Sequence, residues 1–207
     1  MDKMKNGAVL RNGTQRTTKE VFEKYAIVIA FLALLIVVSI LCSSFLTPSN
    51  LILVLNQTSI NGILAVGITY VLITAGIDIS IGSVVGLSGV ISAMVVKAGA
   101  PLPVGFLCGI LAGTLVGVII GILVTKGKLA PYIVTLGFLT IIRGAALLIA
   151  GGRPISSLGD AYGWIGNHNV FGVIPCPVII FLIVVVIGHI ILAHLQIGRY
   201  IYAVGGN

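Results

Sequence analysis

Charged side chains are scarce in this chain. Only 8% of its 207 residues are Asp, Glu, Lys or Arg, whereas 58% are hydrophobic. A soluble domain carries about a quarter charged residues, because water must solvate its surface. The mean hydropathy of +1.20 points the same way. This composition excludes an ordinary soluble domain and predicts an all-α, polytopic transmembrane helical bundle embedded in lipid.

The basic residues are placed in a way that disfavours a nucleic-acid partner, although the net charge is +7. Six of the twelve lie within the first 24 positions, ahead of the first apolar run. Membrane proteins concentrate Lys and Arg on the cytoplasmic side. We therefore expect residues 1–24 to form a basic cytoplasmic tail and residues 25–207 to form the transmembrane domain.

Residues that could bind a metal are few and badly spaced. The three cysteines lie in or beside apolar runs, are odd in number and match no metal motif, so we expect small core hydrophobes. His189 and His194 are five positions apart, on different helix faces, with no carboxylate nearby in sequence. The sequence therefore predicts no metal site.

Apolar runs follow one another along the chain, separated by prolines, glycines and polar residues. Each run approaches the roughly 20 residues that a helix needs to cross a bilayer. The pattern predicts about six spans, at residues 25–46, 51–74, 81–96, 104–125, 131–150 and 175–194.

The bases between the spans indicate their orientation. With the N-terminus inside and six crossings, Lys126, Lys128 and Arg199 lie on the cytoplasmic side and only Lys97 and Arg153 lie outside. This arrangement places the segment between the second and third spans at the cytoplasmic turn. A discontinuous helix pair would keep the same parity and leave that segment at membrane depth, so both positions stay open.

Acidic residues are rarer than basic ones, and Asp78 is one of only two acids after Glu23. It lies between apolar segments, where an unpaired carboxylate costs several kcal/mol, so it is a candidate functional residue. The alternative is a helix cap, since Asp78 followed by Ser80 resembles a helix start. The two roles are compatible, and Ser80 and Ser83 belong to the same candidate site.

Other polar groups within the spans extend this candidate pathway. The second span opens with Asn56, Gln57 and Asn61, and the fifth contains Arg143. The amides suit either hydrogen bonding between helices or a route for a polyol. Arg143 either extends toward the interface, pairs internally or lines the pathway.

A glycine recurs at every fourth position along the fourth span. Such a stripe lets a neighbouring helix approach closely, which favours helix association in lipid. We expect tight helix packing along its whole length, at Gly105, Gly109, Gly113, Gly117 and Gly121.

One catalytic alternative rests on residues 86–89, a Gly-Leu-Ser-Gly segment similar to that of rhomboid-type intramembrane serine proteases. Ser88 would be the nucleophile and His189 its base. Glycine and serine are so common here that a chance match is expected, and no histidine precedes residue 168 to assist an oxyanion site. The chain also lacks a nucleotide-binding glycine loop.

Four segments, in order, resemble permease subunits of bacterial monosaccharide ATP-binding-cassette importers, the ribose-type members most of all. Residues 71–83, VLITAGIDISIGS, are similar to the family signature Thr-x-Gly-Ile-Asp-Leu-Ser-Val-Gly-Ser. The other segments are LNQTSIN at 55–61, the landmark ending in GGRPI at 151–155, and GRYIYAVGGN at 198–207. The resemblance covers nearly everything after residue 45.

The resemblance implies a non-enzymatic permease in the bacterial inner membrane that imports a monosaccharide. Its implied partners are a cytoplasmic ATPase, which alone would use ATP, an extracytoplasmic sugar-binding protein and a second permease copy. We expect a homodimer, and a heterodimer stays open as the alternative. The chain itself would need no cofactor. An ATP-independent channel or carrier is the alternative. Which sugar is carried stays open among ribose, xylose, galactose, inositol and furanosyl signalling molecules.

The same resemblance implies that the last ten residues approach the ATPase. Family members continue beyond this point, so we expect the chain to be the N-terminal part of a longer domain, either as a fragment or as a truncated product. The residues of the approach are Gly198, Arg199, Tyr200, Gly205, Gly206 and Asn207.

Overall fold

The computed structural model of the chain describes residues 25–170 and 172–206. The predicted basic tail and Asn207 lie outside these residues. The chain divides after Leu53 into two compact units, which are described separately. Both consist mainly of helices, in agreement with the predicted fold class.

The first unit contains an apolar helix, Tyr25–Leu41, followed by a turn. The helix is shorter than the predicted span at 25–46, and the reason is local. The Thr47 hydroxyl donates to the Ser44 carbonyl at 2.7 Å, and the Asn50 amide donates to the Phe45 carbonyl at 2.8 Å. These side chains bind carbonyl groups in a non-helical turn and so compete with the helix.

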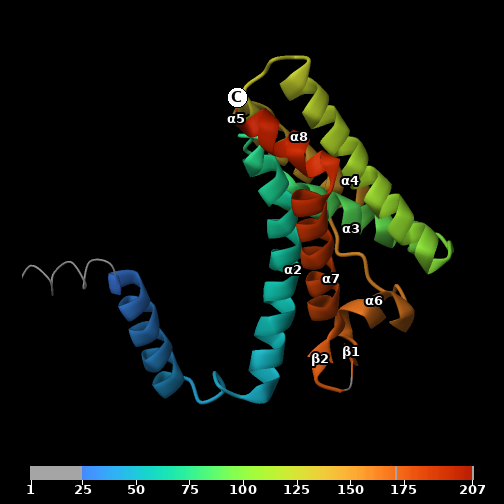
Figure 1. Ribbon diagram of the computed structural model, residues 1–207. Helices are drawn as coiled ribbons and strands as arrows, with labels where there is room; N and C mark the ends of the chain where they lie inside the picture. The colour runs from blue at the N-terminus through green and yellow to red at the C-terminus, as the bar shows by residue number, and fades with distance from the viewer. Residues whose placement is uncertain (1–24, 171, 207) are drawn as a thin grey trace, which may run out of the picture. The chain divides into compact units, whose positions relative to one another are not determined.

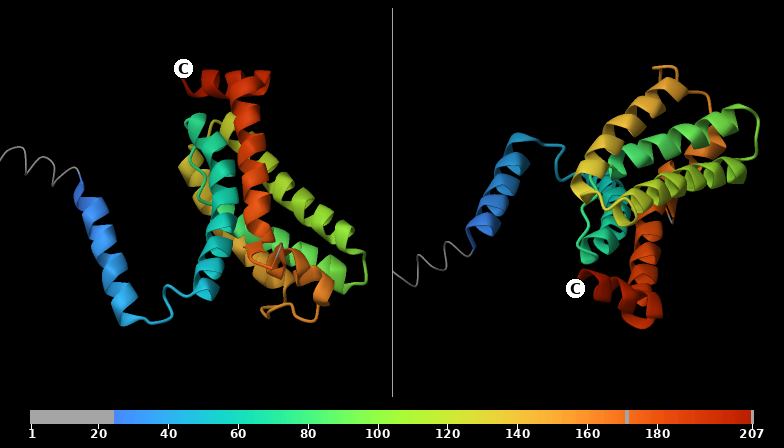
Figure 2. Two further views of the ribbon diagram at one scale, coloured as in Figure 1. Left: turned by 60° about the horizontal axis from the view of Figure 1, so that its bottom comes forward. Right: turned by 90° about the horizontal axis from the view of Figure 1, so that it is seen from above.

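The second unit holds most of the secondary structure (Figures 1 and 2). Helix α2, which begins in the first unit, continues into it. The elements are α2 (Pro48–Ile73), α3 (Ile81–Lys97), α4 (Leu102–Thr125), α5 (Pro131–Ile149), α6 (Asp160–Asn167), β1 (Asn169–Val170), β2 (Ile174–Pro175), α7 (Cys176–His194) and α8 (Gln196–Gly205).

Among the residues that the structure describes, four helices, α2, α4, α5 and α7, are long and apolar enough to cross a membrane. Only 6–17% of the residues in their most apolar windows are buried within the protein, so most of the apolar surface is free to contact lipid. Tyr25–Leu41 and α3 are apolar but shorter. The chain is therefore a polytopic helical membrane protein, whereas the count of six spans and their orientation stay predictions.

Helices α3, α4 and α5 pack together around a small core. Its buried members are Leu87, Val116, Ile120, Val134 and Ile142. Glycine allows the closest part of the packing, because a methyl group at Gly109 would lie 2.8 Å from the Ser88 carbonyl oxygen. A side chain at Gly105 or Gly113 would likewise collide with α3.

The rest of the glycine stripe does not pack as expected. Added methyl groups at Gly117 and Gly121 would meet nothing within 4 Å. The two helices run antiparallel, and α3 begins only at Ile81, so α4 extends beyond it. The last two glycines consequently lie beside the connection between α2 and α3 instead of packing on α3, and the tight contact with α3 ends at Gly113.

Helix α7 lies beside α2 in two views (Figures 1 and 2). The Tyr70 hydroxyl on α2 donates to the Gly188 carbonyl of α7 at 2.9 Å. A methyl group at Gly188 would lie 3.0 Å from Val66. Small residues again let two helices approach closely, and here a partly buried hydroxyl adds a hydrogen bond between them.

Candidate functional site

The connection between α2 and α3 begins with a hydrogen-bonded motif that ends α2. The Gly76 N–H donates to the Val71 carbonyl and the Ala75 N–H donates to the Leu72 carbonyl, each at 3.0 Å. These are the two bonds of a Schellman motif, which requires a left-handed residue after the helix. That residue is Ala75, with φ of 58°. A non-glycine residue in this conformation costs on the order of 1 kcal/mol and is held by its surroundings.

Asp78 follows in a tight turn before α3. Its Oδ1 accepts hydrogen bonds from the Ser80 N–H at 2.8 Å and from the Ser80 hydroxyl at 2.6 Å. Ser80 is fully buried, and Asp78 is half-buried. Within the described part of the chain, Oδ2 makes no hydrogen bond. Asp78 therefore shapes the start of α3 with one oxygen and keeps the other available.

Asp78 lines a cavity of about 280 Å³ between the α2–α3 connection, α4 and α5. Gly117 and Gly121 of α4 form part of its wall, and Thr135 of α5 forms another part. Thr135 is 1% exposed, and its hydroxyl lies 3.3 Å from the Ile77 carbonyl. The two glycines that do not pack against α3 thus leave space beside the carboxylate, and we call this space the Asp78 cavity.

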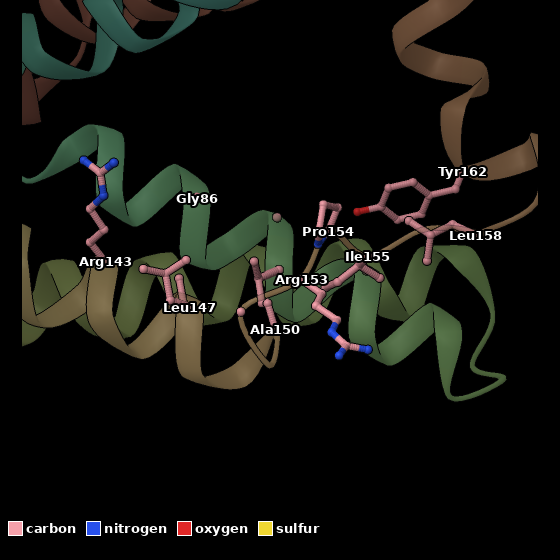
Figure 3. Close-up of a pocket in the computed structure, with 14 residues that line it drawn as sticks. Gly86, Arg143, Leu147, Ala150, Arg153, Pro154, Ile155, Leu158 and Tyr162 are labelled. Carbon is pink, nitrogen blue, oxygen red and sulfur yellow. The ribbon is translucent and has the colours of Figure 1, made fainter.

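A second cavity of about 630 Å³ lies between α3, α5 and the segment that follows α5. Gly86 of α3, Arg143 of α5, and Arg153 and Tyr162 of the following segment are among its lining residues. Figure 3 shows Arg143 at one end of the row of side chains and Tyr162 at the other, with the tyrosine hydroxyl pointing toward Pro154. We call this the Arg143 cavity. A large, mostly apolar space with a few polar groups is typical of a ligand site.

The predicted pathway residues do not form one site. Asp78 and Arg143 line different cavities, and the three amides of α2 line neither. Ser83 connects two helices instead, because its hydroxyl donates to the Leu139 carbonyl at 2.9 Å. The separation of Asp78 from Arg143 could not be predicted from the sequence, since it depends on how α3 and α5 cross.

The amides of α2 differ in environment. The Asn56 side chain donates to the Gly166 carbonyl of α6 at 3.1 Å, and its Oδ1 is buried without a partner among the described residues. Gln57 and Asn61 are exposed on the helix surface. Asn56 therefore attaches the segment after α5 to α2, which is a structural role that the sequence left as one of two options.

Residues of the Arg143 cavity were largely missed by the sequence reasoning. Tyr162 was not singled out as a candidate, Arg153 was named only as an outer-side base and as part of the GGRPI segment, and Gly86 appeared only in the protease alternative. The sequence feature that could have indicated this cavity is the run of small residues on α3, which lies opposite the Arg143 side of α5. Small side chains facing a large polar one commonly indicate space between two helices.

The expected approach to the ATPase forms a separate helix, α8, after a sharp turn from α7. Gly198 is buried, and a methyl group there would lie 2.6 Å from the Ile191 carbonyl oxygen. Arg199 and Tyr200 are exposed. At the other end of α8, a methyl group at Gly205 would overlap the Ile73 carbonyl oxygen at the end of α2.

The histidines need one correction. His189 and His194 were placed on different faces, yet their rings meet edge to face with centroids 5.9 Å apart. His194 is the last residue of α7, so its ring has room to turn toward the preceding helix surface. The part of the chain that the structure describes holds no group of three potential metal ligands. Ser88, the candidate nucleophile, lies against Gly113 in the interface of α3 and α4.

Comparison with known proteins agrees with this architecture. The family described as the permease component of the branched-chain amino acid transport system matches residues 50–207. The ribose import permease protein of Bacillus subtilis is 42% identical over 188 residues, covering 90% of this chain and 58% of the relative. That of Escherichia coli K12 is 36% identical over 200 residues, covering 95% and 62%.

A more distant relative is the D-allose transport system permease protein of Escherichia coli. It is 35% identical over 191 residues, covering 90% of this chain and 57% of its own length. The chain thus spans about three fifths of the length of these curated relatives. No solved structure matches the chain.

Proposed function

Because the chain belongs to the family of transport permease components, we propose that it forms part of the membrane pathway of an ATP-binding-cassette importer for a monosaccharide, ribose or a related pentose. It is a multi-pass protein of the bacterial inner membrane. The observation that carries the proposal is the 36–42% identity with ribose import permeases over nearly the whole chain.

The proposed transporter contains more than this chain. A cytoplasmic ATPase would supply the energy, an extracytoplasmic protein would deliver the sugar, and a second permease copy would complete the pathway. The chain would need no cofactor of its own, since ATP would be used by its partner. The exposed surface of α8, with Arg199 and Tyr200, is the part proposed to approach the ATPase.

The two cavities suit the transport of a polyhydroxy compound. The free oxygen of Asp78 could accept a hydrogen bond from a sugar hydroxyl, and the Arg143 cavity, which lies along the middle of α3, offers guanidinium and phenol donors. Hydrogen bonds in a site of low dielectric constant are strong only while they are satisfied. A sugar that moves along such a route would exchange water contacts for these groups and regain water on the far side.

Reconstitution tests the proposal. The full-length permease, its ATPase and its binding protein are placed in proteoliposomes, and uptake of labelled ribose is measured with and without ATP. We expect uptake only when all three proteins and ATP are present. Sugar flux through the permease alone would instead indicate an ATP-independent channel or carrier, and no flux of any pentose would reject the sugar assignment.

A further inference from the structure

The end of α8 makes an unusually close contact with the end of α2. A methyl group at Gly205 would overlap the Ile73 carbonyl oxygen and would lie 2.8 Å from the Ile73 carbonyl carbon and 3.2 Å from the Thr74 Cα. Among the described glycines, none other comes so close to a backbone group distant in sequence. Gly205 does not have positive φ, so space and not backbone conformation demands glycine here.

The contact between Gly205 and Ile73 lies where the chain leaves α2 and leads into the Asp78 turn. Ile73 is the last residue of α2, and Ala75, held in its left-handed conformation, follows two positions later. Asp78 is three residues beyond Ala75 and binds Ser80, directly ahead of α3. Figure 1 shows α8 lying across this end of α2. A displacement of Ile73 would therefore act on a short segment that already stores strain.

Helix α8 is also fixed at its other end. Buried Gly198 packs against the carbonyl groups of Ile191 and Leu192, where α7 ends. Both ends of α8 thus contact a neighbouring backbone without an intervening side chain. Such contacts transmit movement with little loss, because no side-chain rotamer can absorb it and close-packed atoms resist compression.

We propose that Gly205 is a positioning residue that couples movement of α8 to the Asp78 turn. A partner that pushes on the exposed side of α8 would shift the Ile73 carbonyl, change the backbone at Ala75 and so move the Asp78 carboxylate relative to its cavity. The coupling rests on the proposed function, since it requires an ATPase that acts on α8. It goes beyond that function in assigning the route by which the ATPase reaches the Asp78 cavity.

The test measures sugar molecules transported per ATP hydrolysed in the complete importer reconstituted with the full-length permease. Gly205→Ala inserts the methyl group that has no room. Gly67→Ala is the matched control, because a methyl group at this exposed glycine of α2 would meet nothing within 4 Å. Gly205→Ala should lower the ratio by about fivefold or more, a typical size for coupling between sites. ATP hydrolysis and the amount of permease in the membrane should persist, and Gly67→Ala should match the wild type.

A second variant keeps the test decisive if Gly205→Ala does not assemble. Ala75→Gly removes the left-handed strain without altering α8, and it should also lower the transport-to-ATP ratio while the protein assembles normally. An unchanged ratio in either assembled variant overturns the coupling alone. Absence of ATP-dependent uptake in the wild type overturns the proposed function instead, so the two failures are distinguishable.

Discussion

The two halves of α4 carry the same glycine repeat and use it differently. In the first half, Gly105, Gly109 and Gly113 lie against α3 so closely that a methyl group would collide with it. In the second half, Gly117 and Gly121 meet nothing within 4 Å and line the Asp78 cavity. One sequence pattern therefore serves helix packing in one place and leaves open volume in another, depending on where the partner helix begins.

Among the substitutions that test this difference, the largest effect is expected at Asp78, the charged residue of the cavity beside the second half of α4. Asp78→Ala in the assembled importer should lower sugar uptake about tenfold to a hundredfold, since hydrogen bonds to charged groups contribute about 1.5–3 kcal/mol. The measurement is ATP-dependent uptake normalised to permease in the membrane.

Asp78→Asn is the matched control, because its side-chain oxygen can still accept the two bonds from Ser80. Uptake in Asp78→Asn as low as in Asp78→Ala, at a normal membrane level, would assign the effect to the charge. If both variants lose uptake and membrane level in equal proportion, Asp78 is only a structural cap.

A larger side chain in the first half of α4 should lower the stability of the protein. Gly109→Val places a branched side chain where the Ser88 carbonyl already lies 2.8 Å from an added methyl group. We expect a loss of about 1–3 kcal/mol in the free energy of unfolding, typical of overpacking. Thermal unfolding in detergent checks this. An unchanged midpoint would show that α3 and α4 are not packed as described.

The second half of α4 should tolerate a glycine-to-alanine substitution without loss of stability. Gly121→Ala meets no atom within 4 Å, so its free energy of unfolding should stay within about 0.5 kcal/mol of the wild type. The added methyl group reduces the Asp78 cavity, and uptake should fall by less than in Asp78→Ala. Gly109→Ala, measured alongside, should be the less stable of the two. Equal stability of these variants would contradict the difference between the halves.

A comparably small effect on stability is expected at Thr135, in the wall of the Asp78 cavity. Thr135→Val keeps the shape of the side chain but removes the hydroxyl that lies near the Ile77 carbonyl. Side-chain hydrogen bonds inside membrane proteins contribute about 0.6 kcal/mol on average. The unfolding midpoint in detergent should decrease only slightly. A loss as large as that of Gly109→Val would mean that this hydroxyl, and not the glycine contacts, organises the helices.

Much of the local structure could be predicted from neighbouring residues. Helix α3 was expected at 81–96 and is found at Ile81–Lys97, because glycines and polar residues bound an apolar run there. The start of α2 was also predictable, since the Thr47 hydroxyl precedes Pro48 and accepts a hydrogen bond from the Asn50 N–H. The bond of Asp78 with Ser80 involves residues two apart. Each feature depends on groups within a few positions of one another.

The candidate site was less predictable because its parts are distant in sequence. Asn56 finds its partner in Gly166, and Gly205 meets Ile73. No periodicity or motif connects such pairs. The sequence named Asp78 and Arg143 together as candidate pathway residues, and only the structure shows that they line two different cavities. A polar residue can be recognised from sequence, but the cavity that it lines is formed by other helices.

By itself the sequence determined that this chain is a helical membrane protein of the transport permease family. Hydropathy, scarce charge and motif order are properties of residues and their immediate neighbours, so they need no coordinates. Only the tertiary structure decided which glycines pack, which leave space, and that α8 abuts the segment leading to Asp78. Those outcomes depend on where helices end and cross, because a contact between distant residues exists only when other elements bring them together.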